Sequence, residues 1–337
     1  MKNLISIWVL VTCFTLQADK IKVCATVTDL ASIVEEIGGQ YVELTTFAPA
    51  MGNPHNVIAK PSFIRQLSKA DLYIQVGFEL ESGWAPVLLK NCRNARVQHG
   101  QLGYLDASTV IQPLFEKEGA LSRADGHVHA KGNPHYLMDP VNGLSVAELI
   151  STRLKKLLPE QAAYFNSRTE KFRIKLLRSL IGNKLVEKYP SQKLLILLEK
   201  RKLKEFLRLT KQDKELGGWL HLFNRPQQPK FLADHSSYLY LTKRLDIDVI
   251  GYLEPKPGMT PTTSHLMGLI KRHKGERVKG IFTSSYISPR YTTLLTAKTS
   301  WPTIKLAHQV GALPKCPNYT AMINHNINRI VKALNEL

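Results

Sequence analysis

Residues 20–47 read KIKVCATVTDLASIVEEIGGQYVELTTF, and this stretch decides the fold class. Its first part, 20–27, alternates and is rich in β-branched side chains, which predicts a strand. Thr28 can cap a helix over 30–37, which two glycines then end. Residues 42–47 predict a second strand. A strand, a helix and a second strand in this short space are typical of a βαβ unit on a parallel sheet.

The same alternation continues along the rest of the chain. Further strands are predicted at 71–76, 193–198, 230–233, 249–252, 278–283 and 303–306. Helical patterns are predicted at 61–70, 145–158, 200–222, 236–245, 263–273 and 319–337. The chain of 337 residues is long enough for about two domains. We therefore expect an α/β fold of two αβ lobes with mostly parallel sheets.

Residues 159–189 carry apolar side chains at close to helical spacing, and Pro159 suits the first turn of a helix. A helix of about 30 residues would be about 45 Å long, which is enough to run the length of a domain. We interpret this segment as one long spine helix that joins an N-terminal lobe, 19–158, to a C-terminal lobe, 190–337.

The N-terminus has the pattern of a secretory signal. Lys2 supplies a positive charge, residues 4–16 are apolar, and a cleavage point follows Ala18. We expect a signal peptide over 1–18 and a mature protein in the periplasm. A buried strand or a membrane anchor is the alternative, but the stretch is short for a span and charged residues follow it. Lipid attachment at Cys13 is a minor alternative.

The mature chain would keep only Cys24, Cys92 and Cys316. An odd and sparse set of cysteines is no disulfide framework, and no Cys-x-x-Cys pair suggests a zinc–thiolate cluster. We expect these three residues to be mostly buried apolar side chains, with at most one bridge among them.

The formal net charge is +19, and much of it comes from one segment. Residues 168–211 hold 14 Lys or Arg against 4 Glu, a net of +10. A basic chain can bind nucleic acid, but these charges lack the aromatic interleaving of a base-stacking platform and no nucleic-acid motif is present. We interpret the segment as a solvated basic helix surface that faces solvent, acidic lipid or a partner, and expect no nucleic acid.

Two short motifs place a histidine after Gly-Asn-Pro. They end in His55 and in His135, which is followed by Tyr136-Leu-Met-Asp139. Gly-Asn-Pro favours a turn, and a histidine on a stiff turn loses little freedom when it binds a ligand. Both histidines, with His235 after the strand 230–233, lie in loops between αβ units. Because neutral imidazole is the commonest metal ligand, these loops predict a metal site between the lobes.

An ordered set of motifs covers essentially the whole mature chain. It consists of Phe47-Ala48-Pro49, Asn53-Pro54-His55, Ala70-Asp71-Leu72-Tyr73-Ile74 with Gly77 and Glu81, Gly132-Asn133-Pro134-His135-Tyr136 with Asp139-Pro140, Asp234-His235 with Tyr238, Glu254-Pro255-Lys256-Pro257-Gly258, Ser264-His265-Leu266 and Tyr286. With these motifs the chain resembles the substrate-binding proteins of bacterial zinc and manganese ABC importers. The resemblance implies two αβ lobes joined by one long helix.

The resemblance also implies a metal held between the lobes by three histidines and a carboxylate. His55, His135 and His235 match the three histidine positions. The family's acidic ligand follows the strand 278–283, and this chain has Ser284 there. We therefore expect a three-histidine site in which Ser284 acts through a bridging water at best. Loss of the acid favours Zn²⁺, the transported substrate, over Mn²⁺, which prefers oxygen ligands.

On this interpretation the protein is a monomeric carrier, not an enzyme, that delivers zinc to an ABC permease in the inner membrane. Three alternatives stay open. The cargo could be manganese or iron. The chain could be a relative repurposed as an adhesin or as a carrier of another ligand. A zinc hydrolase would need a general base, for which Glu81 and Glu254 are candidates.

Other polar residues near these motifs have two interpretations each. His127 and His129 could capture metal transiently or be ordinary loop residues. Asp139 could cap the following helix or hold a ligand imidazole, and capping is the better supported role. The remaining histidines are interpreted as structural or surface residues.

Overall fold

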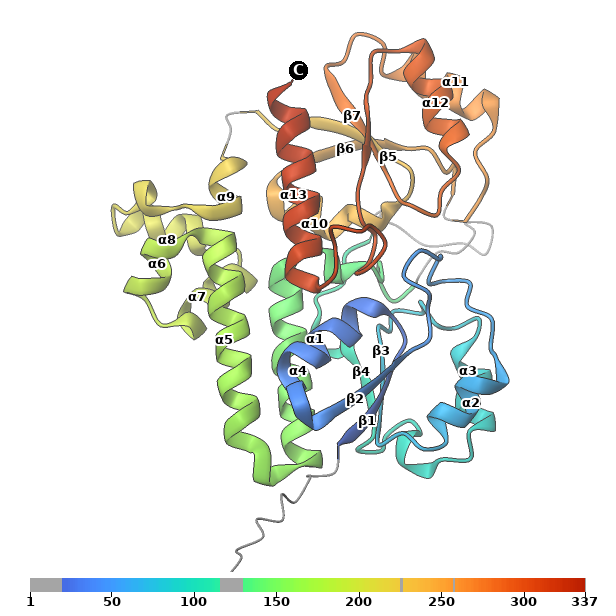
Figure 1. Ribbon diagram of the computed structural model, residues 1–337. Coiled ribbons are helices and arrows are strands. Elements are labelled where there is room, and N and C mark those ends of the chain that lie inside the picture. The colour runs from blue at the N-terminus through green and yellow to red at the C-terminus, as the bar shows by residue number, and fades with distance from the viewer. Residues whose placement is uncertain (1–19, 116–129, 225–226, 257, 337) are drawn as a thin grey trace, which may run out of the picture.

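The computed structural model describes residues 20–115, 130–224, 227–256 and 258–336. Two lobes stand one above the other in Figure 1, each built on a four-stranded parallel sheet. The expected α/β fold of two lobes with parallel sheets is confirmed. The proposed signal peptide, Cys13, His127 and His129 lie outside the described residues.

The N-terminal sheet has the strand order β2-β1-β3-β4, and all its pairs are parallel. Its strands are β1 (Ile21–Ala25), β2 (Val42–Thr46), β3 (Leu72–Gln75) and β4 (Tyr104–Asp106). Its helices are α1 (Thr28–Gly38), α2 (Pro61–Leu67) and α3 (Ala85–Asn91). The predicted βαβ unit is therefore present, while β4 and α3 were not predicted.

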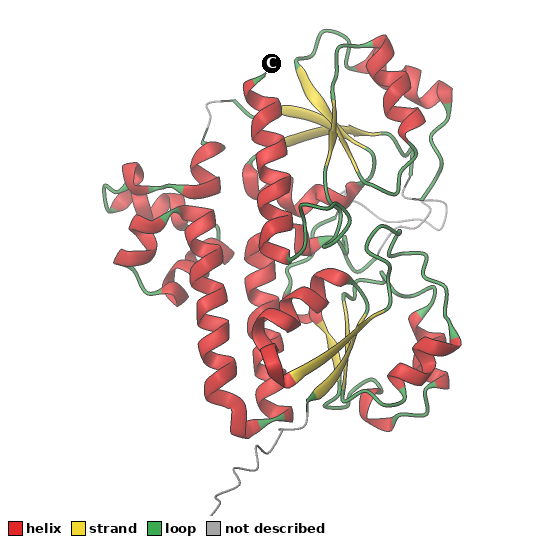
Figure 2. Ribbon diagram, in the orientation of Figure 1, coloured by secondary structure: helices red, strands yellow, loops and turns green. Residues whose placement is uncertain are grey.

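The C-terminal sheet repeats this topology with the order β6-β5-β7-β8, again all parallel. Its strands are β5 (Lys230–Ala233), β6 (Asp248–Tyr252), β7 (Val278–Thr283) and β8 (Thr303–Lys305). The helices around it are α10 (Leu239–Leu245), α11 (Thr263–Arg272), α12 (Pro289–Lys298) and α13 (Tyr319–Asn335). Figure 2 shows that helices cover the faces of both sheets.

The sheets share one core. The largest cluster of buried apolar side chains runs from α1, α4 and α5 through the inner faces of both sheets to α13. A small separate cluster lies under α2 and α3, and another lies under α11 and α12. Each sheet is therefore buried on both faces, as parallel sheets require. Cys24, Cys92 and Cys316 are free and buried, as expected for apolar side chains.

The segment between the lobes is less continuous than the sequence predicted. After α4 (Pro140–Leu157), one turn of 3₁₀ helix leads into α5 (Ala162–Ile181), and α6 (Asn183–Lys188) is separate. The predicted helix over 159–189 is thus broken at Gly182, which has a φ of +85°. A Cβ on Gly182 would lie 2.9 Å from the Cα of Gly217, so close packing of two backbones ends the helix there.

The strand predicted at 193–198 is wrong, because this segment lies within helix α7 (Ser191–Glu199). Its leucines suit either structure by hydrophobicity alone. In the fold, Leu194, Leu195 and Leu198 are buried while Ile196 is exposed. That spacing is the one a helix needs to turn a single face inward. Helices α8 (Leu203–Leu209) and α9 (Gly218–Leu222) complete this helical unit beside α5.

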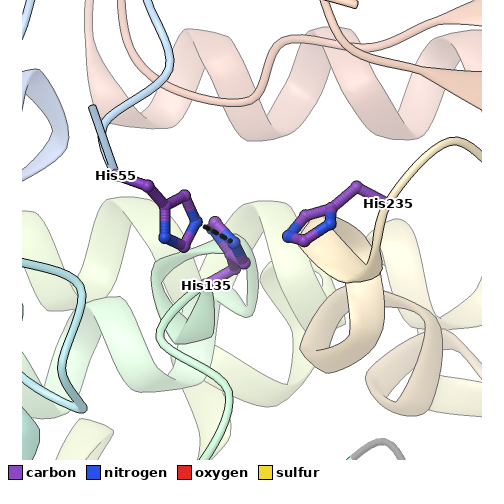
Figure 3. A group of neighbouring side chains, drawn as sticks. All are labelled: His55, His135 and His235. Atoms are coloured by element: carbon purple, nitrogen blue, oxygen red, sulfur yellow. Dashed lines mark hydrogen bonds between the residues drawn. The ribbon is translucent and has the colours of Figure 1, made fainter. Parts of the chain in front are cut away.

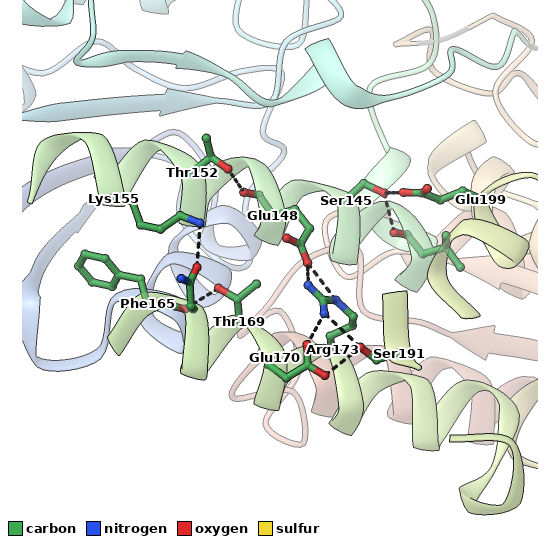
Figure 4. A network of polar contacts seen from close by, with 12 residues as sticks. Ser145, Glu148, Thr152, Lys155, Phe165, Thr169, Glu170, Arg173, Ser191 and Glu199 are labelled. Atoms are coloured by element: carbon green, nitrogen blue, oxygen red, sulfur yellow. Dashed lines mark hydrogen bonds and ion pairs between the residues drawn. The ribbon is translucent and has the colours of Figure 1, made fainter. Parts of the chain in front are cut away.

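A network of polar side chains joins α4, α5 and α7 (Figure 4). The guanidinium of Arg173 bonds to Glu148, Glu170 and the Ser191 hydroxyl, and only 12% of its side chain is exposed. The network holds the start of the helical unit against the two long helices. No described helix is long and apolar enough to cross a membrane.

Candidate metal centre

His55 and His135 stand on two turns built in the same way. The Oδ1 of Asn53 accepts a hydrogen bond from the His55 N–H at 3.0 Å, and the Oδ1 of Asn133 accepts one from the His135 N–H at 2.9 Å. In each case the proline between them fixes φ. The Gly-Asn-Pro-His motif is therefore a side-chain-closed turn, which presents its histidine in a defined direction.

The turn of His135 leads directly into a helix. Tyr136–Met138 forms one 3₁₀ turn, and α4 begins at Pro140 with Asp139 as its N-cap. The Asp139 carboxylate accepts from the Val141 N–H at 2.9 Å. Of the two roles considered for Asp139, capping is therefore confirmed. Asp139 also pairs with Arg244 of α10 across the lobes at 2.9 Å.

His235 comes from the other lobe, two residues after β5 ends. Its Nδ1 donates to the Glu254 carboxylate at 2.9 Å, and that same oxygen accepts the Gly258 N–H. The imidazole side chain is only 7% exposed. Because Nδ1 holds the proton, the lone pair lies on Nε2, which is the nitrogen then available to a metal. Glu254 therefore orients the ring.

The three imidazoles converge between the lobes, as Figure 3 shows. The Nε2 atoms of His55 and His135 are 3.2 Å apart, and one nitrogen from each of the three rings lies within 4.8 Å of the others. Two ligands of a tetrahedral zinc, with bonds of about 2.0–2.1 Å, stand roughly 3.3 Å apart. The Nε2 atoms of His55 and His135 already have that separation, so the cluster is able to hold a divalent ion.

Ser284 follows β7 and is only 2% exposed. Its N–H donates to Asp234, and its hydroxyl lies 3.1 Å from the hydroxyl of Tyr238. These contacts are within the C-terminal lobe. The structure thus places Ser284 on the strand end next to the one that carries His235, with its hydroxyl already in a hydrogen-bond network.

Among the described residues, Asp234 is the one acid that accepts hydrogen bonds from the backbone N–H groups of both His235 and Ser284. It accepts the N–H of His235 at 2.6 Å as well as that of Ser284. Burial raises the pKa of Asp234 to about 6, and the two backbone N–H groups and His235 act in the opposite direction. Asp234 therefore fixes the loop geometry rather than facing the cluster as a ligand.

His308 is another histidine close to these loops, and its contacts are structural. Its Nε2 bonds to the Gly52 carbonyl at 3.0 Å and its Nδ1 to the Ser285 hydroxyl at 3.1 Å. Burial lowers the pKa of His308 to about 4, so the ring is neutral. It links the His55 loop to the other lobe.

Sequence reasoning did not find the role of Glu254. The sequence placed this acid in the motif Glu254-Pro255-Lys256-Pro257-Gly258 and among the candidate bases of a hydrolase, without a contact to His235. The signal lies in the strand order: Ala233 of β5 pairs with Tyr252 of β6, so the second residue after β6, Glu254, lies beside the second residue after β5, His235. It did not find the link from the Asn133 amide to Ser236 of the other lobe either, at 3.0 Å. Both contacts depend on how the lobes meet.

Two relatives match this chain over nearly all of its length and of their own. It is 22% identical over 324 residues to the metal ABC transporter substrate-binding lipoprotein SloC of Streptococcus mutans, covering 94% of this chain and 91% of that protein. It is 25% identical over 346 residues to the manganese ABC transporter substrate-binding lipoprotein PsaA of Streptococcus mitis, covering 98% and 96%.

Solved structures have the same fold. A crystal structure of ZnuA matches with a TM-score of 0.69 at 19% identity, over 94% of this chain and 99% of that one. A manganese-bound mutant of the periplasmic metal-binding protein of Candidatus Liberibacter asiaticus matches with a TM-score of 0.68 at 17% identity, over 94% and 100%. The family model for ZnuA, the periplasmic component A of zinc-uptake complexes, matches residues 23–181 and 180–333, so the chain belongs to this family.

Proposed function

We propose that this protein is an extracytoplasmic substrate-binding protein that captures a divalent metal, zinc in preference to manganese, and delivers it to an ABC permease. The observation that carries the proposal is the convergence of His55, His135 and His235. Membership in the ZnuA family and the names of the metal-transport relatives support it. We further propose that the carrier acts as a monomer, with lobes over 19–158 and 190–337.

The donor set supports zinc. Three neutral imidazoles and one open position suit the tetrahedral geometry of Zn²⁺, with a water in the fourth place. Mn²⁺ prefers oxygen ligands and lies at the weak end of the divalent affinity series. In this proposal Ser284 occupies the position of the family's acidic ligand and contributes through a water at most. The ion is cargo, so moderate affinity would serve its release.

Hydrolysis is less well supported, because the two candidate bases are otherwise engaged. The Glu254 carboxylate accepts from His235 and from the Gly258 N–H. The Glu81 carboxylate is buried and accepts from the Thr26 hydroxyl and two backbone N–H groups. A general base has to reach a metal-bound water, and neither contact set leaves its acid directed at one.

The test is a metal competition titration on chelator-stripped protein, with elemental analysis of the bound metal. We expect one zinc per chain, bound ahead of manganese, and its loss in His135→Ala. His99→Ala removes an exposed histidine and is the matched control, with unchanged affinity expected. Absence of tight binding for every divalent metal would overturn the proposal. Delivery is tested separately, as stimulation of the reconstituted transporter's ATPase by zinc-loaded but not stripped protein.

The cellular location is part of the same proposal. Both SloC and PsaA are named lipoproteins, and the family model is described as periplasmic. We propose export of this chain through residues 1–18, with lipid attachment at Cys13 as the minor alternative. Fractionation of cells, with mass spectrometry of the mature N-terminus, separates a cleaved soluble chain from a lipid-modified one.

A further inference from the structure

A cavity lies away from the histidine cluster, where the helical unit of α7, α8 and α9 meets α10. Its volume is about 230 Å³. Its apolar walls come from five side chains that are each at most 9% exposed: Leu198, Leu203, Leu220, Phe223 and Leu245. An apolar cavity of about 150 Å³ is enough to hold benzene, so this one accommodates a short run of methylene groups.

The remaining wall of the cavity is strongly cationic. Arg201, Lys204, Lys243 and Arg244 line it, against the single acid Asp246. Arg244 is already paired with Asp139. Within the described part of the chain, neither the Lys204 nor the Lys243 ammonium has an acidic partner, and both residues are exposed. We call the edge of the cavity that carries Lys204 and Lys243 its lip. An apolar cavity with unpaired cations on this lip is complementary to an anionic head group that carries an apolar chain.

The charge extends beyond the cavity. Residues 200–211 hold six Lys or Arg against the single acid Glu205, and all six are exposed. Leu209, in the same stretch, is 73% exposed. A flat anionic surface attracts such a segment as a whole, by about 1 kcal/mol for each cation near it. An acidic peptide in the cavity would reach only the cations of the lip, so these observations favour a membrane.

We propose that this cavity is a docking site for an anionic phospholipid, which holds the protein against the membrane surface. The phosphate would lie on the lip between Lys204 and Lys243, and the first part of an acyl chain would enter the apolar hollow. This site is independent of the histidine cluster and of the metal that the protein carries.

The experiment is co-sedimentation of the full mature chain with vesicles at physiological salt. One set is pure phosphatidylcholine, and the other contains phosphatidylglycerol. Lys204→Gln/Lys243→Gln removes the two unpaired cations of the lip. Lys271→Gln/Arg272→Gln removes two exposed cations of α11 and is the control of equal charge. Zinc affinity and circular dichroism verify that both variants are folded.

We expect at least tenfold stronger binding to the phosphatidylglycerol vesicles, a tenfold or greater loss in the lip variant, and less than threefold loss in the control. Soluble short-chain phosphatidylglycerol should release the protein, whereas inorganic phosphate at the same ionic strength should not. Equal binding to both vesicles overturns the proposal. An equal loss of vesicle binding in both variants also overturns it, because binding would then depend on diffuse charge. Release of the protein from the vesicles by inorganic phosphate overturns it as well, because the apolar part of the cavity would then have no role.

Discussion

The contact between His235 and Glu254 decides which nitrogen of that ring faces the cluster. With Nδ1 donating at 2.9 Å, only the other nitrogen keeps its lone pair. Loss of such an orienting acid typically costs 10–100-fold in metal affinity. We therefore predict that Glu254→Gln weakens zinc binding by at least tenfold, measured by competition with a chromogenic chelator.

His273 and Glu276 form a second pair of the same kind in the same lobe, at 3.0 Å. Glu276→Gln is therefore the control for a general effect of losing a His–Glu contact. Its zinc affinity should stay within twofold of the parent. Equal losses in the two variants would mean that Glu254 acts through the stability of the lobe and not through the orientation of His235.

A carboxylate at the position of Ser284 would offset part of the charge of a bound dication. We predict that Ser284→Asp tightens zinc binding and raises manganese affinity by a larger factor, because Mn²⁺ gains the oxygen ligand it prefers. Ser284→Asn has nearly the same volume as Ser284→Asp and no charge, so it should change neither affinity. Isothermal titration with both metals is the measurement, and unchanged affinity in Ser284→Asp would contradict the assignment of this position.

Glu81 makes stability depend on pH in an unusual direction for an acid. Burial raises its pKa from 4.5 to about 7, although the Thr26 hydroxyl and the N–H groups of Val76 and Gly77 bond to it. The folded state then holds a proton that the unfolded chain releases, so this contribution is full below pH 4.5 and is lost as pH rises through 7. Its size is roughly 3 kcal/mol.

We predict that Glu81→Gln removes this part of the pH dependence. Urea unfolding at pH 5 and pH 8 should show a smaller loss of stability in the variant than in the parent, by a few kcal/mol. Asp234 and Asp29, whose pKa values are also raised by burial, leave a residual loss in both proteins. An equal change in the free energy of unfolding between pH 5 and pH 8 in both proteins would show that Glu81 is charged in the folded state.

At the scale of elements, Arg173 is the residue that fastens α7 to α4 and α5. Its guanidinium is mostly buried, while Glu148 and Glu170 remain partly exposed. Arg173→Leu leaves both acids without their partner, and we predict a loss of about 1–3 kcal/mol in the free energy of unfolding. Lys332→Ala breaks an exposed pair with Glu336 and should cost under 1 kcal/mol. Chemical denaturation compares them, and equal costs would contradict the prediction.

The elements show where sequence patterns suffice. Strands β5 and β7 were predicted at their observed bounds, because each is a short run that is mostly apolar and is followed by polar turn residues. The leucine run of α7 was assigned to a strand, because its structure is decided by which leucines find a core. Strand β4 has only three residues, too few for any pattern. Local sequence therefore predicts an element only where the choice between helix and strand does not depend on packing against another part of the chain.

The candidate site divides in the same way. Each Asn-Pro-His turn is closed by its own asparagine, so the direction of His55 and of His135 follows from local sequence. The convergence of these residues with His235 was expected from the family pattern, and the structure brings them together. The contact of Glu254 could not be predicted in this way, because it depends on the order of the strands. Ligation itself remains the prediction that the titration tests.

At the scale of the whole molecule, the two lobes are joined by buried polar contacts as well as by the shared core. Asp29 of α1 accepts the Val310 N–H at 2.6 Å, and the Tyr319 hydroxyl donates to the Leu137 carbonyl at 2.6 Å. Leu137 lies two residues after His135, so the second contact ties the segment that carries this histidine to α13. Buried contacts and a shared core oppose movement of one lobe relative to the other, so we expect small loop movements to be the route for metal entry.

Asp139 and Arg244 form a buried charged contact at this junction. The guanidinium holds both carboxylate oxygens at 2.9–3.0 Å and also donates to the Leu198 carbonyl. The side chains are only 3% and 9% exposed. Arg244→Met leaves the Asp139 carboxylate buried with its charge unpaired. We predict a loss of about 3–5 kcal/mol in the free energy of unfolding, measured with urea.

The double variant Asp139→Asn/Arg244→Met separates a charge effect from a packing effect. Asparagine caps a helix about as well as aspartate, so α4 keeps its N-cap while the unpaired charge is gone. We predict that the double variant recovers more than half of the loss. Because the pair lies between the lobes, and one core runs through both, every variant should unfold in a single transition. If the double variant were no more stable than Arg244→Met, the arginine would act by filling space at the junction, and the charge of Asp139 would be tolerated without it.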